Sequence, residues 1–359
     1  MNIITATKDY ETWLGRRTHL VPADLKLKHQ FMAAAVFPFL RATFYRWLQT
    51  WSEVCPKAAE APRVLAVGDL HVENFGTWRD LEGRLVWGIN DFDETSLMPY
   101  TIDLVRLTTS ALFAAEGEHL GLKPRRIAEC IEDGYRSAIA TGGRAFVLSD
   151  RTGWLRRVAL KQIVEGPQFW EKLLACPVVD AKHVPATARA AIECAMPEKK
   201  LHYGYARRGA GLGSRGHQRY VSVVRWRGGL IAREAKALVP SAAVWLSHHN
   251  QSGPILYSQV LRRAIRCPDP HFRVDGHWIV RRLGPSCRKI AIVELPEKRN
   301  EERLLASMGA ETANIHLGSP NARATIRRDL AHRSSSWLVK AARDMMRFVH
   351  RDWKDWRRA

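Results

Sequence analysis

The residues best suited to chemistry are two aspartates and one asparagine in the first hundred positions: Asp69, Asn74 and Asp91. Carboxylates gathered in one place repel one another unless a cation or a proton joins them. Oxygen ligands of this kind suit a hard ion such as Mg²⁺, which keeps some of its waters and also takes phosphate oxygens. If the three side chains converge, the set therefore predicts a magnesium–phosphate site.

Two apolar runs must position these side chains. Val64–Val67 leads into Asp69, and Leu85–Ile89 leads into Asp91. Between the runs, residues 80–83 form an acidic turn with a glycine, which predicts a β-hairpin that joins the two runs as strands. The paired strands would bring the polar side chains to one edge. Aspartate and asparagine are also common in ordinary turns, because they bond their own backbone, so a purely structural role is the alternative.

The spacing Asp-x-x-x-x-Asn, followed by a strand that ends in Asp, resembles the phosphoryl-transfer arrangement of protein kinases. GDLHVEN followed by INDFDE resembles the aminoglycoside phosphotransferase and choline kinase branch of that superfamily, although Val67 stands where the branch carries a histidine. The longer set GDLHVENFG, NDFDET and IDLVRL, within residues 68–107, resembles domain of unknown function family 2252, a bacterial group without an established activity.

This resemblance implies roles for the polar residues. Asp69 would orient the acceptor hydroxyl or accept its proton. Asn74 and Asp91 would hold Mg²⁺, with Asp93 as a further ligand or as a residue just behind the ligands. The implied activity is ATP- and Mg²⁺-dependent phosphoryl transfer to a small-molecule hydroxyl, a reaction that depends mostly on positioning and charge neutralisation.

A glycine cluster later in the chain fits the same chemistry. It has the pattern GxGxxG and contains Gly211, Gly213, Ser214 and Gly216. A dinucleotide-binding fold requires a helix directly after such a loop. Here Tyr220–Trp226 alternates like a strand, and Leu230–Leu238 predicts a second strand. The pattern favours the phosphate-covering hairpin of kinases, in which backbone N–H groups approach the phosphates, over a plain hairpin.

The strand after the turn should carry a phosphate-binding cation. Where the family has Lys-Glu-Ala, this chain has Arg233-Glu234-Ala235, and arginine keeps the charge but not the geometry of lysine. Lys236 is the other candidate, on the opposite face of a regular strand. Residues 237–266 contain no acidic residue, so the glutamate that pairs with the lysine in kinases is missing or replaced. This departure favours a second hypothesis, a nucleotide-binding pseudokinase without transfer activity.

The order of these segments is unusual for a kinase. Residues 277–285 resemble the strand and hinge between kinase lobes, and Arg303–Leu317 resembles the helix that precedes the catalytic loop in aminoglycoside kinases. The resemblance implies an α+β, two-lobed, protein-kinase-like fold that is circularly permuted, which a chain tolerates where its original termini lie close together. The implied parts are a large catalytic lobe that begins in residues 1–195, a small β-rich nucleotide-binding lobe in 196–288, and a helical completion of the large lobe in 289–359.

Apolar periodicity and breakers predict the helices. The first, at Leu25–Trp51, should be kinked or split by Pro38. Asp103 should cap or anchor a helix at Leu104–Ala115 and could pair with Arg106, three residues on. Further helices are predicted at 124–140, 153–174, 186–195 and 337–356.

Composition limits the partners and the compartment. The formal net charge of +20 favours phosphate-bearing or other anionic partners, although a generally basic surface explains it equally well. A nucleic-acid-binding protein is therefore a third hypothesis, without a recognised motif to support it. The six cysteines form no CxxC pair, and the chain has neither a signal-peptide profile nor an apolar run of membrane-span length. We expect a reduced, cytoplasmic protein, and the resemblance implies a nucleotide and a small acceptor as its partners.

Overall fold

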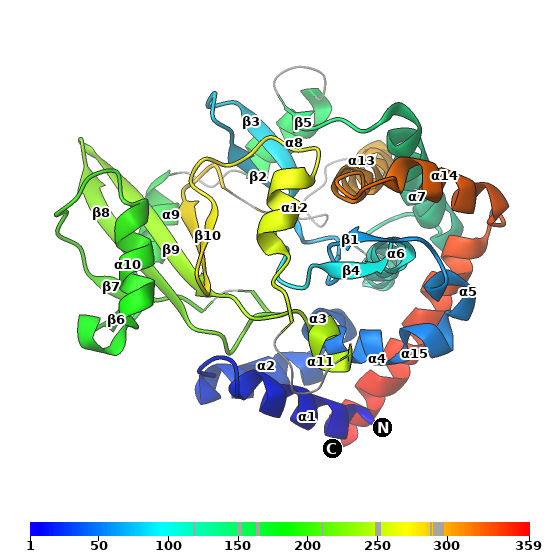
Figure 1. Cartoon of the computed structure of the whole chain (residues 1–359), viewed down its shortest axis with the longest axis horizontal. Helices are drawn as coiled ribbons and strands as arrows, with labels where there is room; N and C mark the ends of the chain where they lie inside the picture. Colours follow the sequence, from blue (N-terminus) through cyan, green and yellow to red (C-terminus); the bar gives the residue numbers. More distant parts are fainter. Residues whose placement is uncertain are drawn as a thin grey trace.

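The structure is a computed structural model that describes residues 1–117, 119–148, 153–162, 166–209, 211–247, 253–287, 289 and 298–359. It combines helices with several antiparallel sheets, so the predicted α+β class is confirmed. A six-stranded sheet stands at one side of a mostly helical body (Figure 1). No helix in the described part of the chain has the length and apolar character needed to cross a bilayer.

The N-terminal helices form one wall of the body. They are α1 (Ile3–Gly15), α2 (Pro22–Ala34), α3 (Val36–Ala42), α4 (Phe44–Val54) and α5 (Pro56–Ala59). The predicted helix at 25–51 is split, but not at Pro38. The backbone is extended at Ala35 and leaves the helical region again at Thr43. Pro38 lies in the first turn of α3, where a backbone N–H has no partner within the helix to lose.

Four short strands carry the acidic motif: β1 (Arg63–Ala66), β2 (Phe75–Arg79), β3 (Leu85–Ile89) and β4 (Ser96–Pro99). The hairpin turn is where the sequence predicts it, because Asp80 accepts hydrogen bonds from the N–H groups of Glu82 and Arg84. The predicted pairing of the two apolar runs is wrong. The turn joins β2 to β3, whereas β1 pairs with β4, and β5 (Phe146–Val147) extends the hairpin sheet.

Long helices pack behind these strands: α6 (Thr101–Glu116), α7 (Pro124–Thr141), α13 (Lys298–His316), α14 (Ala322–His332) and α15 (Trp337–Arg358). Helices α7 and α13 cross with their backbones in contact. A Cβ atom on Gly134 would lie 1.9 Å from the carbonyl oxygen of Ala306, and one on Gly309 would lie 2.0 Å from that of Ile131. Only glycine permits so close an approach.

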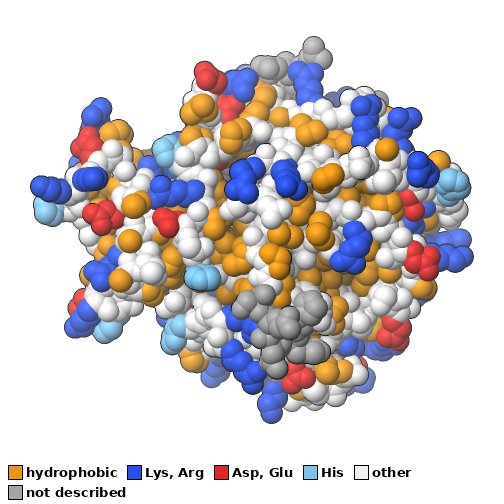
Figure 2. Space-filling model, in the orientation of Figure 1, with side chains coloured by type: hydrophobic (Ala, Val, Ile, Leu, Met, Phe, Trp, Pro, Cys, Tyr) orange, Lys and Arg blue, Asp and Glu red, His pale blue; other side chains and the backbone are white. Residues whose placement is uncertain are grey.

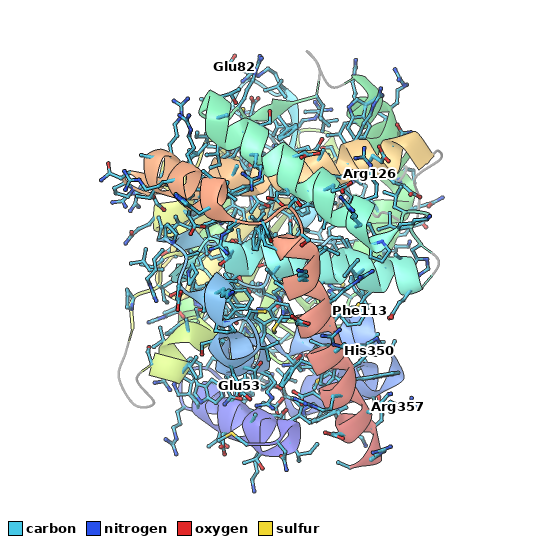
Figure 3. All side chains as sticks on the ribbon, turned by 90° about the vertical axis from the view of Figure 1, so that its right-hand side faces the viewer. Glu53, Glu82, Phe113, Arg126, His350 and Arg357 are labelled. Atoms are coloured by element: carbon cyan, nitrogen blue, oxygen red, sulfur yellow. The ribbon has the colours of Figure 1, made fainter. Side chains whose placement is uncertain are left out.

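Helix α15 packs on the same helical body. Thr109 of α6 donates a hydrogen bond to the carbonyl of Ala342, and His350 lies edge-on to Phe113 at 5.1 Å between ring centroids (Figure 3). The two chain ends lie close to each other, with α15 in contact with α1 (Figure 1).

The six-stranded sheet has the order β10-β11-β9-β8-β7-β6. Its strands are β6 (Val178–Val179), β7 (Tyr205–Arg207), β8 (Arg219–Trp226), β9 (Gly229–Ala237), β10 (Arg273–Asp275) and β11 (Trp278–Leu283). Helix α10 (Ala186–Ala195) covers one face of this sheet, and Leu173 of α9 (Gly166–Leu174) packs on the other. The predicted strands at 220–226, 230–238 and 277–283 are present.

Shorter helices connect these parts: α8 (Gly153–Gln162), α11 (Ala242–Ser247) and α12 (Tyr257–Arg263). The lobe boundaries at residues 195 and 288 stay a prediction. Strand β6 and helices α9 and α10 all precede residue 196, yet they pair with the six-stranded sheet or pack on it.

Candidate functional site

A buried carboxylate fixes the segment Val67–Asn74, which carries Asp69 and Asn74 and is called the motif loop below. Asp103 accepts hydrogen bonds from the N–H groups of Val67 (2.6 Å) and Gly68 (2.8 Å). Its partner is His316 of α13, whose Nε2 lies 2.9 Å from Oδ2, and Tyr135 fixes the other ring nitrogen at 2.8 Å. Asp103 is therefore the predicted anchor, but the predicted pairing with Arg106 is wrong. A segment far along the sequence supplies the partner instead.

Arg106 pairs with Asp69. Both its Nε, at 2.9 Å, and its Nη2 donate to Oδ1 of Asp69, and Nη2 also donates to the carbonyl of Leu40. The guanidinium is fully buried and lies over the rings of Phe44 and Trp47. Burial raises the pKa of Asp69, and the charge of Arg106 opposes that shift. Arginine thus occupies one oxygen of Asp69 and leaves Oδ2 facing Gly213, whose Cβ would lie 3.2 Å away.

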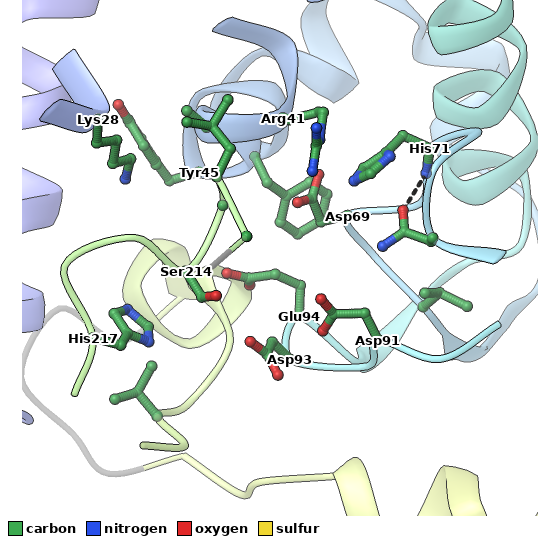
Figure 4. A pocket seen from close by; sticks show the side chains of 18 of the residues that line it. Lys28, Arg41, Tyr45, Asp69, His71, Asp91, Asp93, Glu94, Ser214 and His217 are labelled. Atoms are coloured by element: carbon green, nitrogen blue, oxygen red, sulfur yellow. Dashed lines mark hydrogen bonds between the residues drawn. The ribbon is translucent and has the colours of Figure 1, made fainter. Parts of the chain in front are cut away.

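Asn74 fixes the shape of the loop. Its Oδ1 accepts a hydrogen bond from the N–H of His71 at 2.7 Å (Figure 4), so one lone pair of that oxygen stays available to an ion. The carbonyl of Asn74 accepts from the N–H of Asn90 at 3.0 Å. This bond ties the loop to the residue just before Asp91.

Asp91 and Asp93 meet Lys236 of β9. The lysine Nζ contacts Oδ2 of Asp93 directly and lies 3.8 Å from Oδ1 of Asp91. Burial raises the pKa of both carboxyl groups. For Asp93 the neighbouring charge of Asp91 adds to that rise, whereas for Asp91 the charges of Lys236 and Lys289 reverse it. The two carboxyl groups therefore titrate as a pair, with one ionised and the other readily protonated.

Whether these residues can bind Mg²⁺ depends on which of their side-chain oxygen atoms have no other partner. Oδ1 of Asp93 is buried and has no hydrogen-bond partner among the described residues. Among all the described residues, no three His, Cys, Asp or Glu side chains form a group that could bind a metal. Asn74, Asp91 and Asp93 would thus form only part of a coordination shell. That composition fits a Mg²⁺ ion whose other ligands are waters and phosphate oxygens.

The glycine loop faces this acidic cluster. A cavity of about 60 Å³ is lined by Asp69, Asn74, Asp91 and Asp93 and, from the loop, by Gly211, Gly213 and Ser214 (Figure 4). Gly216 lines neither this cavity nor the larger one next to it, within the described residues. It has φ +103° and packs on Leu25 of α2, so its role is to turn the chain.

The structure separates the two candidate cations on β9. Arg233 lies on the face that α10 covers and donates to the carbonyl of Ala195 at 2.7 Å. Lys236 lies on the other face, at the acidic cluster. Only Lys236 is brought to the site, because side chains alternate along the strand.

Glu234, on the same face as Lys236, organises a basic wall that sequence reasoning missed. Its fully buried carboxylate binds Arg208 at 2.5 Å and Arg281 at 2.7 Å, with Arg219 at 3.5 Å. These three charges hold the pKa of Glu234 well below its usual range, although burial acts in the opposite direction. One feature of the sequence could have indicated this wall: Glu234 is an acidic residue on the inward face of a strand in a very basic sheet.

All three arginines and Lys236 line a larger cavity of about 560 Å³ between the sheet and the motif. Its other walls are partly aromatic. Tyr257 stacks on Phe272 and meets Phe92 edge-on, with ring centroids 5.7 Å apart in both pairs. This volume lies within the usual range for small-molecule and cofactor sites, and the mixture of cations and aromatic rings suits a ligand with both phosphates and a ring.

The fold and this site define a mixed α+β protein whose glycine loop and basic strand face an acidic cluster. Residues 17–163, which span α2 to α8 and include the acidic motif, match the family model described as "Uncharacterized protein conserved in bacteria (DUF2252)". The resemblance to this family is therefore confirmed over that segment. Searches of curated proteins and of solved structures give no significant match.

Proposed function

We propose that this protein is an ATP- and Mg²⁺-dependent phosphotransferase that acts on a small-molecule hydroxyl. One observation carries the proposal: Asp91 and Asp93 of the motif meet the buried Lys236 of the sheet between two cavities, and the glycine loop borders both of them. Phosphoryl transfer needs donors on one wall and metal ligands on the other, and this arrangement supplies both.

The larger cavity would hold the nucleotide. Arg208, Arg219 and Arg281, preorganised by Glu234, would neutralise phosphate oxygens, and the rings of Tyr257 and Phe272 would border the base. Asn74, Asp91 and Asp93 would hold Mg²⁺, which supplies charge neutralisation at the transferred group.

Asp69 would position the acceptor. In the transfer, the hydroxyl oxygen bonds to the terminal phosphorus, the bond from that phosphorus to the bridging oxygen breaks, and the nucleoside diphosphate leaves. The hydroxyl proton passes to Asp69 or to water. Because Arg106 occupies Oδ1, we infer that Oδ2 accepts the hydrogen bond from the hydroxyl. The salt bridge favours the ionised carboxylate, which can both orient the hydroxyl and accept its proton.

A circularly permuted kinase-like order is part of the proposal. Three observations support it: α13 packs beneath the motif through His316, the sheet that carries the glycine loop follows the motif in sequence, and the chain ends lie together (Figure 1). Adjacent termini are what a permuted chain requires.

The pseudokinase is the second candidate, and one observation favours it. Lys236 pairs with Asp93, whereas an active kinase pairs this lysine with a helical glutamate. The nucleic-acid hypothesis has only the net charge in its favour. On the face that Figure 2 presents, Lys and Arg side chains are dispersed among apolar ones and form no single patch.

The deciding experiment is ATP turnover with a panel of small hydroxyl compounds, with and without Mg²⁺, in the wild type and in Asp91→Ala. The phosphotransferase proposal expects acceptor-dependent ADP release that requires Mg²⁺ and is lost in the variant. Nucleotide binding without turnover for any acceptor would establish the pseudokinase instead. Absence of both binding and turnover would exclude both.

A further inference from the structure

The smaller cavity continues past the motif toward the N-terminal helices. There it is lined by Tyr10 of α1, Lys28 of α2 and Tyr45 of α4, together with Glu94 and His217 (Figure 4). We call this part the N-terminal compartment. The residues that line both cavities are Arg41, Asp91, Gly211 and Lys289, so the two spaces meet beside Asp91.

Lys28 is an anomaly in this compartment. Its side chain is only 2% exposed, yet it forms no hydrogen bond or ion pair with any described residue. Buried lysines in proteins are normally paired, because an isolated ammonium loses its hydration without compensation. Burial lowers the pKa of Lys28, while the more distant carboxylates of Glu11 and Glu94 oppose that shift.

Two further polar groups of the compartment lack partners. Tyr10 is buried, and its hydroxyl makes no hydrogen bond within the described structure, whereas the stacked Tyr45 bonds Thr7 at 2.8 Å. Nδ1 of His217 is also buried without a partner among the described residues. Unsatisfied buried groups are uncommon, and several around one cavity indicate that a ligand satisfies them.

The charges of the compartment favour an anionic ligand. The other buried or partly buried charged groups that face it already have partners. Arg106 holds Asp69, Glu73 binds Arg41 at 2.6 Å, and Glu94 accepts hydrogen bonds from Ser241 and from the N–H of Ala242. Asp91 and Asp93 face Lys236, whereas Lys289, at the border with the larger cavity, is exposed. Lys28 is thus the one buried cation lining this cavity, among the described residues, that no carboxylate contacts.

We propose that the N-terminal compartment is the acceptor site, that the acceptor is a small hydroxy compound with one anionic group, and that Lys28 binds that group. The inference rests on the proposed phosphotransferase function. The free Oδ2 of Asp69 borders this cavity and not the larger one, so the reacting hydroxyl must lie here. A volume of about 60 Å³ corresponds to roughly four water-sized positions, which excludes oligosaccharides.

The test compares matched three-carbon ligands: glycerate and glycerol 3-phosphate as anions, glycerol as the neutral analogue, and 3-amino-1,2-propanediol as the cation. Binding is measured by calorimetry, and turnover is measured with ATP and Mg²⁺. The variants are Lys28→Met and, as the matched control, Lys26→Met at an exposed position of the same helix. Methionine fills the buried space without charge, so the folded state should persist, and the melting temperature checks this.

We expect one or both anions to bind at least tenfold more tightly than glycerol, and we expect Lys28→Met, but not Lys26→Met, to abolish this preference while ATP affinity stays unchanged. Equal binding of neutral and anionic ligands, or a preference for the cation, would overturn the inference. So would an anion preference that survives in Lys28→Met. Anion binding that depends on Lys28 in a protein that binds no ATP would uphold the site and refute the proposed phosphotransferase.

Discussion

Nε2 of His316 lies 2.9 Å from Oδ2 of Asp103, although 213 residues separate the two in sequence. Both side chains are completely buried. Asp103 in turn accepts from the backbone of Val67 and Gly68, so a helix near the C-terminus supports the loop that presents Asp69. The candidate site is thus assembled from both ends of the chain.

Asp103→Asn should destabilise the fold and loosen the motif loop. The amide can accept only one of the two backbone hydrogen bonds, and its NH₂ group then faces the other N–H. An unsatisfied buried group costs about 1–3 kcal/mol. Urea unfolding should show this loss, with Asp344→Asn at a partly exposed site as the control. An unchanged midpoint would mean that the loop does not depend on this carboxylate.

Asp69→Asn should abolish transfer and largely spare nucleotide affinity, because Asp69 borders the acceptor cavity and not the larger one. Loss of a positioned proton acceptor typically costs about 10²–10⁴-fold in rate. Single-turnover assays and nucleotide titration measure the two quantities separately. A variant that loses ATP binding to the same extent as activity would contradict the assignment.

Lys236 and Arg233 should differ sharply in their effect on nucleotide binding. Lys236→Met removes the cation that contacts Asp93, and we expect at least about a tenfold loss of ATP affinity, or 1.4 kcal/mol. Arg233→Met, on the face covered by α10, should leave affinity within about twofold. Equal losses of ATP affinity in the two variants would show that the alternation of side chains along β9 does not decide which cation binds the nucleotide.

ATP should raise the melting temperature more with Mg²⁺ than without it, because Asp91 and Asp93 repel the phosphates unless a cation lies between them. Thermal unfolding over a range of ATP concentrations measures the shift. Asp93→Asn should reduce the difference between the two conditions. Identical shifts with and without the metal would exclude these ligands.

Ionisation of Glu311 should lower the stability of the folded protein as the pH rises. Its carboxylate accepts from the N–H of Ile89 at 3.2 Å, and burial raises its pKa to about 7 from 4.5. Below pH 4.5 the carboxyl group of Glu311 is protonated in both the folded and the unfolded state. Between 4.5 and 7 the unfolded chain ionises while the folded protein retains the proton, which lowers stability by about 3 kcal/mol at most.

Glu311→Gln cannot ionise, so the change in unfolding free energy between pH 5 and pH 8 should be smaller in the variant than in the wild type. Denaturant titration at the two pH values measures this difference. Equal changes in both proteins would show that Glu311 titrates at its ordinary pKa.

Local patterns were enough to predict most elements and the acidic motif. The run at 124–140 shows helical periodicity, and Asp80 to Gly83 has turn chemistry, so both appear where expected. The pairing of the strands could not be predicted from the sequence. Nothing in the composition of β1 distinguishes β4 from β3 as its partner, because register and pairing depend on the whole core.

The partners of individual side chains were equally hidden. Arg106 is three residues from Asp103 and suits a helical ion pair, but its guanidinium reaches Asp69 between the rings of α4. Lys28 looks like a solvated helix residue, yet it is buried and lines a cavity together with Tyr10 of α1 and Tyr45 of α4. Long-range packing decided both, and a single sequence carries no record of it.

The glycine contact between α7 and α13 has a consequence for synthesis on the ribosome. Helix α7 emerges early, but its partner surface around Gly309 follows about 175 residues later, which is roughly 10–35 s at common elongation rates. Throughout that interval the apolar face of α7 that includes Ile131 and Tyr135 lacks its cover. Nascent chains of this protein should therefore depend on chaperones until α13 leaves the exit tunnel.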